Sequence, residues 1–182
     1  MSVIIGDENK LGELILYISR KCATDPRFGA IKLNKILYFS DFYAFGNAST
    51  SITEVDYQHL INGPAPRRLR PVRDRLQSIG ALALQHVVLK SGKTQTRTIA
   101  LRTPDLTAFT GEEIALVDDV IDMLWDDDAD SVSERTHRYV GWKMTQLGET
   151  IPYGSIFLSD EPLSSAEILR GQELANQLGL MA

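Results

Sequence analysis

The sequence contains a single cysteine and no long apolar run, and each scarcity excludes a class of protein. With Cys22 alone, no disulfide can form within the chain. Residues 1–6 carry no basic side chain and only a short apolar run, so they do not resemble a signal peptide. No stretch approaches the roughly 18 apolar residues that a membrane span requires. We therefore expect a cytoplasmic protein that makes no use of a membrane.

The sequence also lacks the motifs of common catalytic and cofactor sites. It has no glycine-rich phosphate loop and no nucleophile elbow. Its three histidines do not have metal-ligand spacing. Residues 126–130 begin a calcium-loop pattern, but Ser131 and His137 replace its essential glycine and glutamate, so we interpret the segment as a solvated acidic loop. We expect a protein that is not an enzyme and has no catalytic residue, cofactor or metal.

The overall composition is that of an ordinary globular protein. The chain has 182 residues, of which 43% are hydrophobic and 24% are charged. A chain of this length can bury a core without a disulfide or a metal. It contains no internal repeat and no low-complexity linker, so we expect one domain that spans residues 1–182.

Two helices are predicted near the N-terminus. The first has an apolar stripe at helical spacing, formed by Leu11, Leu14, Ile15, Ile18 and Cys22. Asp25-Pro26 ends it, because the residue before a proline avoids helical geometry. The second is expected over residues 30–44 and is apolar around most of its circumference, which is typical of a helix at the centre of a domain. Its aromatic residues are most simply core.

The middle of the chain predicts extended structure on both sides of a short helix. Residues 52–61 are rich in β-branched and aromatic residues and predict a strand. A helix is expected over residues 67–79. Residues 82–89 and 94–101 flank Ser91-Gly92-Lys93, which predicts a β-hairpin.

The final third predicts further helices, each starting at a capping box. In a capping box, a hydroxyl residue and a glutamate three positions later satisfy backbone N–H groups at the start of a helix. The candidate boxes are Thr110 with Glu113, Ser131 with Glu134, and Ser164 with Glu167. The expected class is α+β and predominantly α-helical: a central buried helix within a helical bundle, with a small antiparallel β-hairpin or sheet.

Charge is distributed very unevenly along the chain. Residues 67–102 carry nine Lys or Arg against one Asp, whereas residues 103–182 carry four against sixteen Asp or Glu. So many cations are too many to bury unpaired. We therefore expect a solvent-facing basic surface that binds another macromolecule. It includes Arg67, Arg68, Arg70, Arg73 and Lys93.

A basic helix followed by a hairpin is also the arrangement of a winged helix. In that fold the helix enters a groove of the nucleic acid and the hairpin touches phosphate. The alternative function is therefore a winged-helix-like nucleic-acid-binding protein or a transcriptional autorepressor. The arginines do not all share one helical face, and the rest of the chain is acidic. A nucleic acid is therefore a weaker candidate for the partner than a protein.

Several segments together resemble the Panacea domain of SocA-like antitoxins. They are Lys32–Asp41 in the expected central helix, Tyr57-Gln58-His59, Gly63-Pro64, Ser131–His137 and Trp142. Their order and spacing, over about Leu11 to Ile156, carry the resemblance. Considered alone, Gly63-Pro64 is most simply a turn, and His137 with Trp142 is most simply a packing pair.

The resemblance implies a mostly helical domain that neutralises a cognate toxin, encoded nearby, by direct contact. Some relatives act instead as adaptors for proteolysis, so a protease complex is a further partner that the resemblance allows. It implies no cofactor and no catalytic residue. If the basic surface does not bind the toxin, the next candidate is an exposed edge around Tyr57, Gly63 and Pro64.

Overall fold

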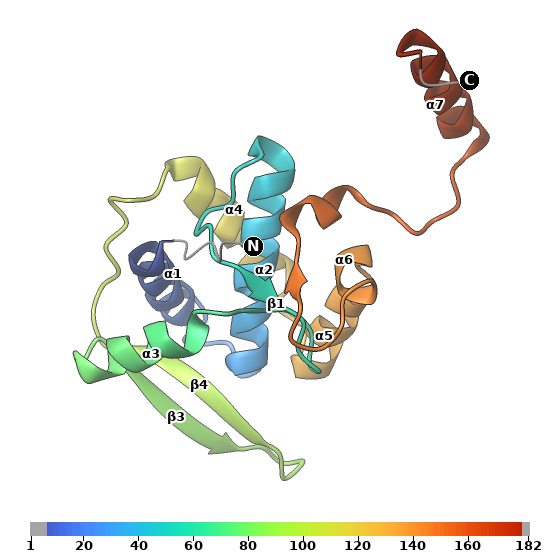
Figure 1. The fold of residues 1–182 in the computed structure, drawn as a ribbon. Helices are drawn as coiled ribbons and strands as arrows, with labels where there is room; N and C mark the ends of the chain where they lie inside the picture. Colours follow the sequence, from blue (N-terminus) through green and yellow to red (C-terminus); the bar gives the residue numbers. More distant parts are fainter. Residues whose placement is uncertain (1–6, 180–182) are drawn as a thin grey trace.

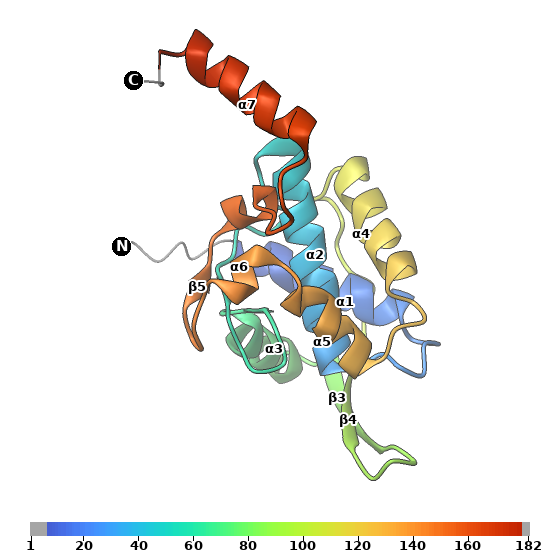
Figure 2. The same ribbon diagram turned by 90° about the vertical axis from the view of Figure 1, so that its right-hand side faces the viewer.

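The computed structural model describes residues 7–179 and is mainly helical, with two small antiparallel sheets (Figure 1, Figure 2). Helix α2 (Ala30–Ala48) lies at the centre, and α1 (Glu8–Lys21), α4 (Gly111–Met123) and α5 (Ala129–His137) pack against it. The predicted α+β, predominantly helical class is confirmed. None of the helices within the described part of the chain has the length and apolar character needed to cross a bilayer.

Helix α1 forms where the apolar stripe predicts it. Asp7 precedes it and accepts hydrogen bonds from the backbone N–H groups of Asn9 and Lys10, both at 2.9 Å. These bonds satisfy two of the free donors at the helix start. All five residues of the predicted stripe are buried. Among them, Cys22 packs as a small hydrophobe, and burial raises the pKa of its thiol to about 12.

Helix α2 is apolar around nearly its whole circumference, as expected. Its fully buried side chains include Leu33, Ile36, Leu37, Tyr38, Phe39 and Phe42. The helix continues past the predicted end at Ala44 and stops at Ser49, which has left-handed geometry (φ 57°). The extra turn is held by packing, since the Phe45 ring stacks on Tyr153 with 5.4 Å between ring centroids.

The strand predicted over residues 52–61 is wrong except at two residues. Strand β1 is Tyr57–Gln58, and it pairs antiparallel with β2 (Ala65–Pro66) on one side and β5 (Thr150–Ile151) on the other. Before β1, Glu54 is left-handed (φ 54°). The Asp41 carboxylate also accepts the backbone N–H of Thr53 at 2.8 Å, so this N–H is unavailable to a neighbouring strand.

The predicted helix and hairpin of the basic segment are confirmed. Helix α3 (Leu69–Ser78) precedes β3 (Leu82–Val88) and β4 (Thr94–Ala100), which pair in register from Leu82 with Ala100 to Val88 with Thr94. The hairpin is attached to the core through β4. Arg97 donates hydrogen bonds to the carbonyl oxygens of Asp25 and Ala23, at 2.8 and 3.1 Å.

Two of the three predicted capping boxes are present. Thr110 with Glu113 caps α4, and Ser164 with Glu167 caps α7 (Ser165–Gln177). The third is wrong, because Asp128 caps α5 and Ser131 occupies the third helical position. A carboxylate three residues upstream accepts the N–H groups of Asp130 and Ser131 at 3.1 and 2.9 Å, so the helix starts earlier than the Ser131–Glu134 pair predicts.

The remaining elements close the fold and lead away from it. Helix α6 (Val140–Lys143) and the 3₁₀ helix η1 (Tyr153–Phe157) pack against each other, and η1 also packs against α2. Beyond η1 the chain extends outward, and α7 stands apart from the body in both ribbon views (Figure 1, Figure 2). No residue of α7 is buried.

Candidate partner-binding site

Residues from three distant segments meet at one point beside α2. They are Lys35 on α2, Gly63 in the β1–β2 loop (residues 59–64) and Thr136 on α5. Gly63 has φ +91°, and a Cβ placed on it would lie 2.5 Å from Thr136 Oγ1 and 2.7 Å from Lys35 Nζ. Such distances are too short for carbon, so only glycine allows the loop to pass this close to the helix.

Lys32 and Lys35 are both buried on α2, and their ammonium groups differ in hydrogen bonding. Lys32 donates to Asp25 Oδ2 at 2.7 Å and to the carbonyl oxygens of Trp125 and Asp127 at 2.7 and 2.9 Å. Within residues 7–179, Lys35 donates only to Pro64 O, at 3.1 Å. An ammonium has three N–H donors. Burial without a compensating anion lowers the pKa of Lys35 to about 7.

An aromatic stack lies beside Lys35. Trp142 is held between two imidazoles, with ring centroids 3.9 Å from His137 and 4.3 Å from His59. The predicted packing of His137 against Trp142 is thus confirmed. Burial, followed by the positive charge on Lys35, lowers the pKa of His137. Within the described residues, His137 Nε2 and Trp142 Nε1 are buried and lack a hydrogen-bond partner.

A pocket of about 280 Å³ opens at this place. Its walls are formed by Ile31, Asn34 and Lys35 of α2, by residues 60–63 of the β1–β2 loop, and by Leu147. Leu147 belongs to the α6–β5 loop (residues 144–149), which is tied to the first loop by backbone hydrogen bonds between His59 and residues 148 and 149, at 2.8 and 2.9 Å. We call this cavity the Lys35 pocket.

The Lys35 pocket has a charged interior and an apolar mouth. Lys35 is 1% exposed, and the buried Asn34 Oδ1 has no partner among the described residues. At the mouth, Ile61 is 76% exposed and Leu147 is 64% exposed. Exposed apolar side chains around a cavity are typical of a surface that a partner covers.

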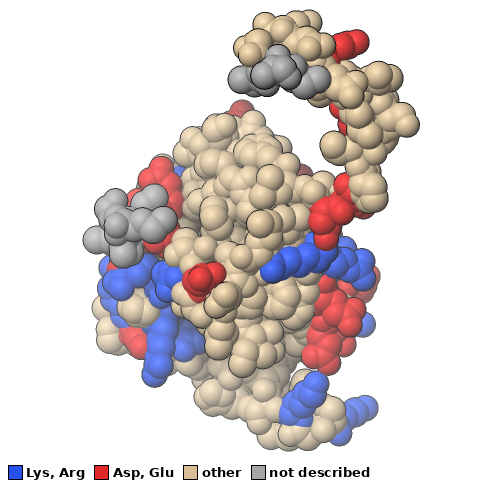
Figure 3. Space-filling model, turned by 45° about the vertical axis from the view of Figure 1, so that its right-hand side comes forward, with Lys and Arg blue, Asp and Glu red and all other residues tan. Residues whose placement is uncertain are grey.

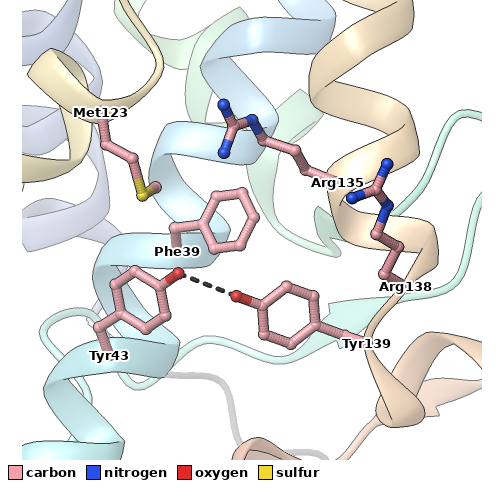
Figure 4. Close-up of a pocket in the computed structure, with 6 residues that line it drawn as sticks. All are labelled: Phe39, Tyr43, Met123, Arg135, Arg138 and Tyr139. Carbon is pink, nitrogen blue, oxygen red and sulfur yellow. Dashed lines mark hydrogen bonds between the residues drawn. The ribbon is translucent and has the colours of Figure 1, made fainter.

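A second pocket, of about 190 Å³, lies between α2, α4 and the end of α5 (Figure 4). Phe39 and Tyr43 form one side, and Tyr43 Oη lies 2.9 Å from Tyr139 Oη. Arg135 and Arg138 extend along the opposite side in Figure 4. Arg135 is already paired with Asp127 at 2.6 Å. One of the two arginines of this pocket is therefore already neutralised by a carboxylate.

The predicted basic surface is only partly free. Arg70 and Lys93 are exposed, whereas Arg67, Arg68 and Arg73 are half-buried. Arg67 donates to Gly148 O at 2.6 Å, Arg68 pairs with Glu8 at 2.5 Å, and Lys93 reaches Asp130 at 3.2 Å. Figure 3 shows Lys and Arg gathered on the side of α3 and again at the hairpin tip, with a broad uncharged face between them.

Tyr57, Gly63 and Pro64 are all buried, so these three residues do not themselves form the exposed edge predicted around them. Tyr57 is fully buried and donates its hydroxyl to Asp41 Oδ2 at 2.7 Å. Its ring lies in the aromatic core, 5.6 Å from both Tyr38 and Phe42. Instead, Gly63 has no side chain and leaves room for the Lys35 ammonium, and the carbonyl oxygen of Pro64 accepts a hydrogen bond from it.

Sequence reasoning missed the residues that form the Lys35 pocket. Lys35 and Asn34 lie inside the Lys32–Asp41 segment, but the sequence alone assigns them no role. The available signal was two lysines in a helix that is otherwise apolar on all sides, because a buried lysine requires a partner. Ile61 and Leu147 carried no local signal.

Comparison with known proteins identifies the family of this chain. The chain matches no curated protein and no solved structure. A family model described as "Antitoxin SocA-like, Panacea domain" matches residues 33–143, more than half of the chain. That range contains the pocket residues from Asn34 to Gly63 together with Thr136, His137 and Trp142. The chain therefore belongs to the SocA-like antitoxin family with a Panacea domain.

Proposed function

We propose that this protein is an antitoxin that neutralises a cognate toxin by direct contact, and that it acts by binding and not by catalysis. The observation that carries the proposal is the mouth of the Lys35 pocket, where Ile61 and Leu147 expose apolar surface. Residues of the family's motifs meet directly beneath it. Protein interfaces commonly combine an apolar centre with a polar rim.

The uneven charge distribution supports the same proposal, because it affects how a partner protein first approaches this one. Arg70 and the hairpin lysines Lys90 and Lys93 are exposed, while the final third of the chain is acidic. Opposite charges on separate faces orient a folded partner as it approaches and raise its association rate. In this arrangement the basic surface, which includes Arg73, assists association, and the pocket mouth supplies the stable contact.

Co-expression tests the proposal. The protein is produced together with the toxic product of its neighbouring gene, and growth and co-purification are measured. Growth should be restored and the two proteins should purify together. Ile61→Asp should abolish both results, because it places a charge in an apolar interface. Ile79→Asp is the matched control, since Ile79 is 65% exposed but lies at the end of α3.

The outcomes of this experiment are distinct. If Ile61→Asp protects fully and Ile79→Asp does not, the toxin binds the side of α3 and the pocket proposal is wrong. If wild-type protein does not protect against any neighbouring product, the antitoxin proposal itself fails. Measuring the toxin's half-life during rescue separates simple neutralisation from delivery to a protease, since delivery shortens it.

A nucleic-acid-binding function is the second candidate, and the order of α3 followed by the β3–β4 hairpin favours it. Internal hydrogen bonds of Arg67, Arg68, Arg97 and Arg102 leave few free cations for phosphate. Arg70→Glu with Lys90→Glu and Lys93→Glu tests it, because these side chains are exposed. Duplex binding with a steep salt dependence that this variant loses would favour the second candidate.

A further inference from the structure

The Lys35 pocket contains a buried cation whose hydrogen-bonding capacity is mostly unused. Within the described chain, the Lys35 ammonium has one acceptor, Pro64 O, and no carboxylate within ion-pair distance. Lys32, one turn earlier on the same helix, is equally buried and uses all its donors. Buried charges in folded proteins are normally paired. Lys35 therefore has two N–H donors for which the described residues supply no acceptor.

The positive charge of Lys35 favours an anion in this pocket. Asn34 lines the same pocket, and its amide has an unpaired buried oxygen. Rotation of the amide by 180° would present its NH₂ group instead. His137 on α5 lies close enough for the Lys35 charge to lower its pKa, and Glu134 and His59 act on His137 in turn; none of the three forms an ion pair with Lys35. A carboxylate would thus meet an ammonium and an amide without a competing anion.

We propose that the Lys35 pocket receives an acidic side chain of the partner protein, with Lys35 as its counter-charge and with Ile61 and Leu147 covering the apolar residues that flank it. The inference rests on the proposed function and names the chemistry of the contact. A cavity of about 280 Å³ accommodates one side chain. A free metabolite would leave the apolar mouth exposed, whereas a protein segment covers it.

The proposal is tested with two blocked tripeptides, Ac-Ile-Glu-Leu-NH₂ and Ac-Ile-Gln-Leu-NH₂, which differ only in the central charge. Binding to the full chain is followed by NMR of the Lys35 side chain, assigned from its loss in Lys35→Met. At pH 6.5 the Glu peptide should bind about tenfold more tightly than the Gln peptide, because the ammonium then pairs with a charged carboxylate instead of a neutral amide oxygen. Equal affinities, or no binding of either peptide, would overturn the proposal.

Variants distinguish the contribution of the Lys35 charge to peptide binding from that of the apolar mouth. Lys35→Met and Lys35→Gln should remove the preference for the Glu peptide. Ile61→Ser, at an exposed position, should weaken both peptides equally and retain the preference. Lys93→Met is the control for a surface lysine and should change nothing. A preference that persists in both Lys35 variants would show that another cation binds the carboxylate, and the proposal would be wrong.

The pH dependence gives an independent readout. The pKa of Lys35 is about 7 in the free protein, so at pH 9 the group is largely neutral and the preference for the Glu peptide should be lost. Binding of the Glu peptide should in turn raise this pKa. Burial and the positive charge on Lys35 lower the pKa of His137, so a loss of the preference between neutral pH and pH 9 does not report on His137. A preference that is unchanged at pH 9 would contradict the assignment of Lys35.

Two further comparisons test whether the carboxylate comes from a protein or from a free acid, and whether the partner is a toxin. Acetate, used as a probe at the same pH, should bind much more weakly than the Glu peptide; equal affinity would favour a free acid and overturn the choice of a protein side chain. If the peptide results hold but growth rescue fails, the pocket chemistry stands and the partner is not a toxin. If rescue succeeds and Lys35→Met protects fully, only the pocket inference fails.

Discussion

Lys32 and Lys35 lie one turn apart on α2 and are each 1% exposed, yet among the residues that the structure describes only Lys32 has an ion-pair partner. The Lys32 ammonium joins Asp25 to the chain after α4, and so connects three segments of the core. The Lys35 ammonium has one carbonyl acceptor within residues 7–179. One lysine thus holds the fold together, while the other introduces a charge that the fold does not compensate.

Lys35→Met should stabilise the protein at neutral pH. The ordinary pKa of 10.5 applies to the unfolded chain and a pKa of about 7 to the folded one. Between these values the unfolded state binds more protons, so the wild-type free energy of unfolding rises with pH. The variant should gain about 1–4 kcal/mol at pH 7 and lose this rise. Urea unfolding at pH 7 and pH 9.5 measures both; a variant less stable at pH 7 would show that the ammonium is compensated.

Lys32→Met should have the opposite effect and is the matched comparison. It leaves the fully buried Asp25 carboxylate without its cation. Removing one partner of a buried pair costs about 3–5 kcal/mol. Urea unfolding at pH 7 should therefore give a large loss for this variant, alongside a gain for Lys35→Met. Similar losses of stability in both variants would mean that the two lysines have the same structural role.

Gly63→Ala should destabilise the fold more than a strained backbone alone explains. The left-handed geometry costs about 1–3 kcal/mol for a residue with a Cβ, and here the Cβ also meets Thr136 and Lys35 at under 3 Å. Gly92→Ala is the control, because Gly92 also has positive φ (+79°) but no heavy atom within 4 Å. Comparing the thermal unfolding of the two variants separates the effect of the steric contact from that of the backbone strain. Equal losses would mean that the loop moves away freely.

Leu37→Ala tests the central position of α2. Leu37 is fully buried, so truncation removes apolar contacts and leaves a cavity, with an expected loss of about 2–5 kcal/mol. Leu163→Ala, at a position 66% exposed before α7, should change stability little. Chemical denaturation of both variants gives the comparison, and a loss well under 1 kcal/mol at Leu37 would contradict the architecture.

Tyr57→Phe should destabilise the protein in a pH-dependent way. Burial raises the pKa of Asp41 to about 6 from 3.8, so the folded state binds more protons than the unfolded state in this range. The associated stability is present below pH 3.8 and is lost as pH rises through 6. Losing the Tyr57 donor, 2.7 Å from Asp41, raises this pKa further and costs about 1–3 kcal/mol above pH 6.

Stability curves from pH 4 to pH 8 check this expectation. The difference between Tyr57→Phe and the wild type should be small at pH 4 and grow as Asp41 ionises. Tyr153→Phe removes a part-buried hydroxyl that donates to Val55 O at 2.7 Å and not to Asp41, and its effect should not follow the ionisation of Asp41. A Tyr57→Phe effect that is constant with pH would show that Asp41 is not the group involved.

Local patterns along the chain were sufficient for most of the helices and for the hairpin. The stripe of Leu11 and its partners, and the two hydrophobic runs around Ser91-Gly92-Lys93, encode periodicity that a helix or strand must match to bury one face. Errors occurred where two local signals compete or a distant group intervenes. Asp128 capped α5 in place of Ser131, and the Asp41 carboxylate bound the backbone at Thr53, within the segment predicted as a strand.

The site was decided by tertiary structure. The segments that resemble the Panacea domain include Gly63, His137 and Trp142. They did not show that Lys35 lies against Gly63 and Thr136, about 30 and 100 residues away along the chain. Whether a buried lysine is paired depends on acceptors supplied by other elements, and the spacing of residues within one helix carries no information about those acceptors.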